Sequence, residues 1–156
     1  MAFDAASGKT VLLGYDVGPV QRFKTFLWDG VTWISQDAGV DPRGAAIMVA
    51  SPGGPILFGG DVGGTYSPDS FLWKDNAWQA QGVDGPPVIY GAMSIELTYS
   101  HGATFILYGG QKQDGTISNE TWRCSWGTGD PFGPWQLTAW ERITTEIGRA
   151  SCRERV

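Results

Sequence analysis

The chain has 156 residues, enough for one ordinary domain with a buried core, and 23 of them are glycine, about twice the usual share. Charged residues make up 17% and the net charge is −5, so the basic surface that nucleic-acid binding requires is missing. Aromatic residues reach 13%, which argues against disorder. Glycine and aromatic residues with scarce lysine and leucine favour strands joined by tight turns, and we predict an all-β fold.

The first predicted unit spans residues 1–41. It retains only the end of an opening strand, in residues 1–4, so we expect it to be incomplete. Further along it contains Gly14 and two tryptophans, Trp28 and Trp33, that straddle a predicted hairpin. Each tryptophan buries a large apolar area, and we expect the pair to lie in a core between neighbouring sheets.

The second unit, residues 42–86, repeats the first with a shift of 45 residues. The shift carries Gly14 onto Gly59 and the tryptophan pair onto Trp73 and Trp78. Four short extended segments bounded by turn-forming residues are predicted here, at residues 44–50, 55–60, 69–74 and 77–81. Consecutive hairpins of this kind make a four-stranded antiparallel meander.

The third unit, residues 87–140, repeats the pattern with a slightly longer period. Gly109 and Gly110 follow its second predicted strand, and Trp122 is aligned with Trp73 of the second unit. Its extended segments are predicted at residues 89–99, 103–109, 119–125 and 134–139, the last of which contains Trp135.

The end of the chain, residues 141–156, contains a stretch, residues 146–156, that differs abruptly from the rest because it is basic and lacks strand patterns. Back-translated, residues 147–156 resemble a common short-read sequencing adapter that is followed by a stop codon. We interpret this stretch as non-native and expect a natural chain that is truncated near residue 145; an ordinary basic tail is the alternative. Without the tail, Cys124 is the only thiol and no internal disulfide is expected.

The repeat resembles that of the kelch family, which has a double glycine after the second strand, an aromatic in the third and a tryptophan in the fourth. These marks are Gly59-Gly60, Trp73 and Trp78 in the second unit, whereas the first unit departs at Tyr15, where a second glycine is expected. The resemblance implies a partial β-propeller of four-stranded antiparallel blades, with about 2.5 to 3 blades present. Closed propellers have ~4–8 blades. Remaining blades of a parent chain, or self-association, would therefore be needed to close the ring.

In such a blade, the loops after the second and fourth strands emerge on one face, where kelch proteins commonly bind their partners. We expect a non-catalytic binding or scaffolding module for a protein or carbohydrate ligand, without a cofactor or metal. The candidate contacts on these loops are Asp16, Arg22, Asp61, Tyr66, Gln111, Lys112 and Asp114. Aspartates outnumber the basic loop residues Arg22, Arg43 and Lys112, so the surface leans acidic. The simpler alternative is that these aspartates only cap turns and keep the surface soluble.

No catalytic arrangement is indicated by the sequence: His101 is the only histidine, and there is no nucleophile elbow, metal-ligand cluster or Ser/His/Asp pattern. The alternative is the propeller portion of a galactose-oxidase-like or carbohydrate-active enzyme whose catalytic residues lie outside this chain. No apolar run reaches the ~18 residues of a membrane helix, and no secretory leader is visible at Met1. The glycine- and tryptophan-rich, lysine-poor repeats favour a bacterial secreted or cell-surface location.

Overall fold

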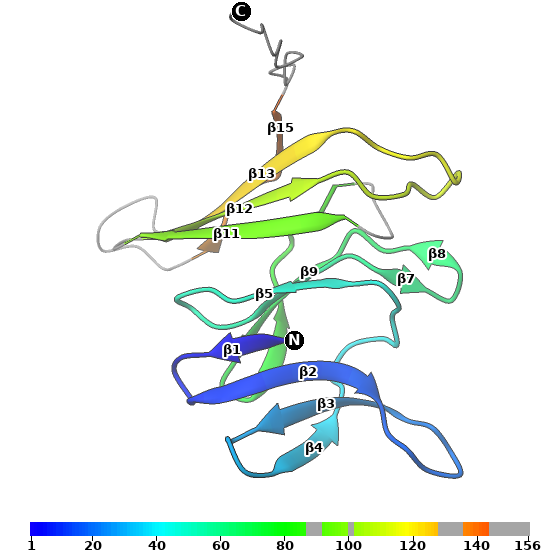
Figure 1. The fold of residues 1–156 in the computed structure, drawn as a ribbon, viewed down its shortest axis with the longest axis vertical. Coiled ribbons are helices and arrows are strands. Elements are labelled where there is room, and N and C mark those ends of the chain that lie inside the picture. Colours follow the sequence, from blue (N-terminus) through cyan, green and yellow to red (C-terminus); the bar gives the residue numbers. More distant parts are fainter. Residues whose placement is uncertain (87–91, 100–101, 128–135, 144–156) are drawn as a thin grey trace, which may run out of the picture.

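The computed structural model describes residues 1–86, 92–99, 102–127 and 136–143. The regular elements of these residues are strands, which confirms the all-β prediction. They form three main antiparallel sheets stacked one above the other in chain order (Figure 1). The same residues contain no helix that is long and apolar enough to cross a membrane.

The first sheet is a meander in which consecutive strands pair antiparallel. Its strands are β1 (Ala2–Asp4), β2 (Lys9–Tyr15), β3 (Phe23–Trp28) and β4 (Trp33–Asp37). The turn between β3 and β4 is held by Asp29, whose Oδ1 accepts hydrogen bonds from the backbone N–H groups of Val31 and Thr32, each at 2.8 Å. An aspartate in this position stabilises a tight reversal, because its side chain replaces the missing strand hydrogen bonds.

The second sheet repeats the meander and adds a small hairpin to its middle connection. The sheet strands are β5 (Ile47–Val49), β6 (Ile56–Phe58), β9 (Ser70–Lys74) and β10 (Ala77–Ala80). The hairpin consists of β7 (Asp61–Val62) and β8 (Thr65–Tyr66). Each of the four sheet strands lies inside the segment predicted for it, so the local pattern was sufficient to place them.

The third sheet has the longest strands and a divided outer edge. Its strands are β11 (Met93–Tyr99), β12 (Gly102–Tyr108), β13 (Thr121–Gly127), β14 (Gln136–Leu137) and β15 (Glu141–Ile143). Both β14 and β15 pair with β13, at its opposite ends. The predicted segment at 119–125 starts too early, since β13 begins at Thr121. Trp135 lies outside the described residues.

The strand register corrects the predicted alignment of the third unit with the second. In the second sheet Leu57 pairs with Phe71, and in the third sheet Leu107, at the same distance before the double glycine, pairs with Trp122. Trp122 therefore takes the place of Phe71 and not that of Trp73. The connection that precedes β13 is one residue longer than the one that precedes β9, so Cys124 stands at the position of Trp73, and Trp122 lies two residues earlier on the same face of the strand.

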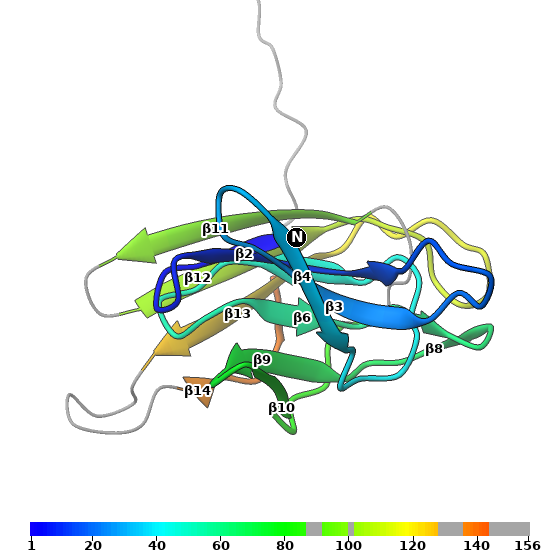
Figure 2. The ribbon, with the colours of Figure 1, turned by 90° about the horizontal axis from the view of Figure 1, so that it is seen from below.

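The core consists of two apolar layers, one on each side of the second sheet. Figure 2 shows the stack from below, with the first sheet in front. The layer between the first and second sheets contains Val11, Leu27, Leu57, Trp73 and Trp78. The layer between the second and third sheets contains Val49, Ile56, Phe58, Leu72, Ala103, Phe105, Cys124, Trp126 and Leu137. Because the second sheet is covered on both faces, β6 is apolar and buried at every position instead of at alternate positions.

The two tryptophan pairs occupy the same register, with Trp28 opposite Trp33 and Trp73 opposite Trp78. Their ring centroids are 5.3 and 5.2 Å apart. The second pair lies in the core as predicted, with exposed fractions of 2% for Trp73 and 8% for Trp78. The prediction is wrong for Trp33, which is 46% exposed because no sheet in the described part of the chain covers that face of the first sheet.

Both complete double glycines use a backbone conformation that other residues adopt at a cost. The φ angles are 59° and 104° for Gly59 and Gly60, and 74° and 91° for Gly109 and Gly110. A Cβ atom on Gly60 would lie 2.8 Å from the carbonyl oxygen of Gly44, which is closer than real contacts allow. The double glycine thus turns the chain out of the second strand where another segment approaches closely.

The first sheet lacks this break after its second strand. Gly14 lies inside β2, and Tyr15, at the position where a second glycine was expected, continues the strand by pairing with Phe23. The rings of Tyr15 and Phe23 also pack edge to face, with centroids 5.2 Å apart. Strand β2 consequently extends beyond the point at which β6 ends.

Candidate binding surface at the loop edge

Three long connections lie along one edge of the stacked sheets, on the right in Figure 1. Each joins the second strand of its sheet to the third, and they comprise residues 16–22, 59–69 and 109–120. We call these residues the loop edge. The connections share an edge because the second strands of all three meanders run in the same direction. All seven candidate contacts that the sequence singled out lie on the loop edge.

The first loop is closed by Asp16. Its Oδ1 accepts a hydrogen bond from the backbone N–H of Arg22 at 2.7 Å, and its own N–H donates to the Arg22 carbonyl at 2.9 Å. The carboxylate therefore joins the two ends of the loop by a hydrogen bond made within the loop itself. The side chains that this loop exposes to solvent include those of Val17 and Val20.

The second loop contains the β7–β8 hairpin, whose turn is capped by Asp61. The Oδ1 atom of Asp61 accepts a hydrogen bond from the backbone N–H of Gly64 at 2.6 Å. The Asp61 backbone exchanges two further hydrogen bonds with Gly44, at 2.8 and 2.9 Å. Asp61 therefore anchors the hairpin to the segment that precedes β5.

Tyr66 is half-buried at the base of the same hairpin, and its hydroxyl donates to the carbonyl oxygen of Pro86. Burial, followed by the negative charges of Asp84 and Asp69, raises the pKa of Tyr66. The phenol therefore stays protonated and remains a donor near neutral pH. The same two aspartates line a cavity of about 110 Å³, which gives this part of the surface its acidic character.

The third loop is also held by its own polar side chains. The amide of Gln111 donates to a backbone carbonyl four residues further on, at 2.9 Å, and the Lys112 ammonium lies 3.1 Å from a carboxylate oxygen of Glu120. Asp114 accepts hydrogen bonds from the hydroxyl and the backbone N–H of Thr116, at 2.6 and 2.9 Å. These two bonds hold the pKa of Asp114 below its ordinary value.

Gln113, which the sequence did not single out, connects the second and third loops. Its Oε1 accepts a hydrogen bond from the backbone N–H of Tyr66 at 2.6 Å, and its Nε2 donates to the carbonyl of Gly64 at 3.1 Å. One amide side chain thus satisfies two backbone groups of the neighbouring hairpin. Sequence patterns could not reveal this link, because its two sides are almost 50 residues apart.

Replacing Gln113 by alanine is expected to release the two loops from each other. We expect the Tyr66 amide to exchange with solvent at least about tenfold faster, because it loses its acceptor, while global stability falls by only about 1 kcal/mol. Hydrogen exchange followed by NMR measures both effects. Gln79→Ala, on the exposed side of β10, is the matched control, and an equal change in that variant would contradict the assigned role of Gln113.

Arg43 departs from the prediction of an exposed loop cation, because its side chain is only 1% exposed. Its Nη1 donates to the carbonyl of Gly59 at 3.0 Å, and its Nε donates to the carbonyl of Asp41 at 3.2 Å. The guanidinium lies over the Phe71 ring, 4.9 Å from the centroid, and 3.9 Å from a carboxylate oxygen of Asp69. Arg43 therefore connects the segment before β5 to the start of the second loop, although burial lowers its pKa.

Cys124 is the nucleophilic thiol of the described residues, and it lies in the core layer between the second and third sheets. It is 1% exposed, and its Sγ lies 3.1 Å from the carbonyl oxygen of Thr138. Burial raises the pKa of Cys124 to about 12 despite that hydrogen bond. Near neutral pH the group is a thiol and not a thiolate, which makes it a packing residue.

The raised pKa predicts that Cys124 is inert towards a disulfide reagent in the folded chain. The protein for this measurement carries Cys152→Ser, since Cys152 lies outside the described residues. At pH 8 we expect labelling on the order of 1,000-fold slower than in denaturant, because the thiolate fraction falls with the raised pKa. An added exposed cysteine, Thr65→Cys, is the control and should react at the rate of an unfolded thiol. Rapid labelling of folded Cys124 would contradict the assigned burial.

These elements define a class of protein: stacked antiparallel sheets that carry three internally braced loops along one edge. Among the residues that the structure describes, no group of three histidine, cysteine, aspartate or glutamate side chains could hold a metal ion. A scan against protein-family models finds no match, and a search of curated proteins finds no significant similarity. The function is therefore inferred from the repeat and from the loop edge.

Proposed function

We propose that the chain is part of a kelch-type β-propeller and acts as a non-catalytic module that binds a protein ligand through the loop edge. Three related units, two of which have a double glycine, support the propeller, since each repeat of that family supplies one four-stranded blade. The three stacked meanders agree in strand order and direction with consecutive blades. Under this proposal the blades correspond to residues 1–41, 42–86 and 87–140.

The main support for a binding role is that side-chain hydrogen bonds hold the loops in a fixed shape. The polar groups of Asp16, Asp61, Gln113 and Asp114 are bonded to loop backbone and hold its shape. Aliphatic side chains of the first and third loops, by contrast, face solvent, with Ile117 in the third loop 79% exposed. A preorganised loop loses little entropy on binding, and exposed aliphatic side chains gain by leaving water. Such side chains favour a protein ligand over a carbohydrate.

The experiment uses a peptide selected from a displayed library against the immobilised chain, with a glycan array probed in parallel. We expect Val17→Asp and Ile117→Asp each to raise the Kd of the selected peptide at least about tenfold. Val31→Asp is the matched control. Val31 is 80% exposed in the β3–β4 turn, which lies at the opposite edge of the first sheet.

An unchanged Kd for the control together with a raised Kd for both loop variants supports the proposal. A Kd that responds to Val31→Asp and not to the loop variants would place binding elsewhere and overturn it. Binding on the glycan array alone, with the same response to the variants, would replace the protein ligand by a carbohydrate.

A further inference from the structure

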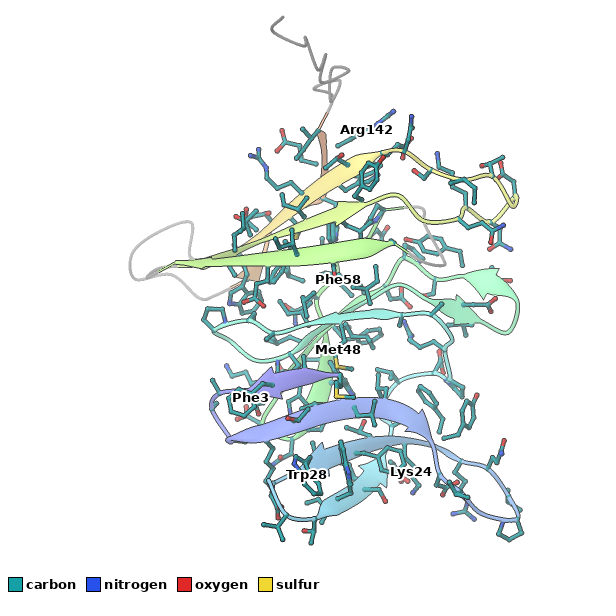
Figure 3. All side chains as sticks on the ribbon, in the orientation of Figure 1. Phe3, Lys24, Trp28, Met48, Phe58 and Arg142 are labelled. Atoms are coloured by element: carbon teal, nitrogen blue, oxygen red, sulfur yellow. The ribbon has the colours of Figure 1, made fainter. Side chains whose placement is uncertain are left out.

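The first sheet presents an apolar face that points away from the second sheet. Val11 and Leu27 lie in the layer against the second sheet, so their strand neighbours Leu12, Phe26 and Trp28 point to the opposite side. Phe3 and Trp33 extend the same face across the outer strands, and they are 53% and 46% exposed. We call this surface the outer face; its five residues are Phe3, Leu12, Phe26, Trp28 and Trp33. Figure 3 shows Trp28 at the end of the stack that is opposite to Arg142.

The tryptophan pair of the outer face has an equivalent pair inside the molecule, and the structure shows which surface covers that equivalent pair. Trp28 and Trp33 correspond in register to Trp73 and Trp78, which the first sheet covers. The indole Nε1 of Trp78 donates to the hydroxyl of Thr25 at 3.1 Å across that contact. The surface that covers such a tryptophan pair is therefore the face of a β-sheet, with aliphatic side chains and one hydroxyl group that accepts a hydrogen bond from an indole.

The third sheet presents a face of this kind at the other end of the stack. Ile95 and Leu97 are 55% and 50% exposed, and Ile106 lies between them and the third strand. Thr121 pairs with Tyr108, as Thr25 pairs with Leu13 in the first sheet, so its hydroxyl takes the place of the Thr25 acceptor. We call the side that bears Ile95, Leu97, Ile106, Tyr108 and Thr121 the far face.

One residue of the far face departs from the pattern. Arg123 stands where Leu27 stands in the first sheet, which introduces a charge at the edge of the apolar surface. The charge is compensated, because Arg123 lies 2.6 Å from a carboxylate oxygen of Glu141. On the outer face Lys24 is likewise paired with Asp37, at 3.1 Å. Neither face therefore requires a counter-charge from its partner.

We infer that the outer face binds the far face of a second copy of this chain, twice, so that two copies close a ring of six sheets. The inference rests on the proposed propeller architecture. Each copy supplies three main sheets, and a ring of six falls within the ~4–8 blades of closed propellers. Closure buries both faces, whereas a head-to-tail contact that did not close would continue into a filament. At each junction Trp33 donates to Thr121 of the other copy, as Trp78 donates to Thr25.

Sedimentation of the full chain over a range of concentrations tests the inference. We expect a species of twice the 16.8 kDa chain mass. Trp33→Glu on the outer face and Ile95→Glu on the far face should each raise the dissociation constant at least roughly 30-fold. Both side chains are already half-exposed, so both variants are expected to fold. Gln79→Glu, on the exposed side of β10 in the second sheet, is the control and should leave the mass unchanged.

Mixing the two variants separates this head-to-tail contact from any other dimer. A mixture contains one intact outer face and one intact far face, so it should form a dimer with one junction although each variant alone is monomeric. A chain that is monomeric at all concentrations, a filament without an end point, or a dimer that survives Trp33→Glu overturns the inference. A monomer that still binds its ligand at the loop edge overturns the ring alone, while a dimer without such binding overturns the proposed function alone.

Discussion

Replacing Gly54 by alanine is expected to lower the free energy of unfolding by at least about 3 kcal/mol. Gly54 ends the turn between β5 and β6 with a φ of 123°, a region that residues with a side chain rarely adopt. An added Cβ would lie 2.2 Å from the carbonyl oxygen of Trp73. Backbone on both sides must then move, in a turn that also holds a hydrogen bond from the Trp73 N–H to Pro55 at 2.7 Å.

Gly63→Ala is the matched control for this effect. Gly63 also has a positive φ, of 62°, but nothing lies within 4 Å of its added Cβ. The loss of unfolding free energy in Gly63→Ala is therefore limited to backbone strain of about 1 kcal/mol. Denaturant unfolding followed by tryptophan fluorescence measures both variants. Equal losses would show that the close approach to Trp73 contributes nothing, contrary to the structure.

Replacing Arg43 by methionine is expected to lower the free energy of unfolding by about 3 kcal/mol. The methionine retains most of the apolar stem that packs in the core, but it cannot donate to the carbonyls of Gly59 and Asp41. The buried Gly59 carbonyl then loses a charged donor, and the contact with the Phe71 ring is lost as well. The second loop begins at Gly59, so we also expect faster amide exchange across residues 59–69.

Arg142→Met provides the matched control in the same unfolding experiment. The Arg142 side chain is 55% exposed and lies 3.4 Å from a carboxylate oxygen of Glu120. Exposed ion pairs contribute little, and we expect a loss below about 1 kcal/mol. If Arg43→Met proves no more costly than Arg142→Met, the buried arginine is not the connection that the structure indicates.

The strands of the second sheet could be predicted from the sequence because short apolar runs there are bounded by glycine, proline and aspartate. The tryptophan alignment of the third sheet could not. Trp122 resembles Trp73 in type, yet pairing with Leu107 assigns it the position of Phe71. One additional loop residue changes the register, and only the hydrogen-bonded neighbour strand reveals this.

The candidate contacts lie together at one edge, as predicted, and three of them are hydrogen-bonded within their own loops. Asp16, Asp61 and Asp114 lie on the loop edge, where their carboxylates accept hydrogen bonds from their own loops. That outcome agrees with the simpler alternative of turn capping. Gln113 and Arg43 carry the contacts between segments, and both depend on residues that are distant in the chain. Such contacts have no local sequence signal.

The sequence by itself determined the class of fold. Repeating hairpins, glycines at positions of positive φ and the shortage of helix formers specify antiparallel meanders through interactions between residues close in the chain. Only the tertiary structure decided which faces of those meanders are buried. Trp33 and Trp78 stand in equivalent hairpins, yet one is 46% exposed and the other 8%. Burial depends on which sheet lies opposite, and that is a property of the assembled stack and not of the repeat.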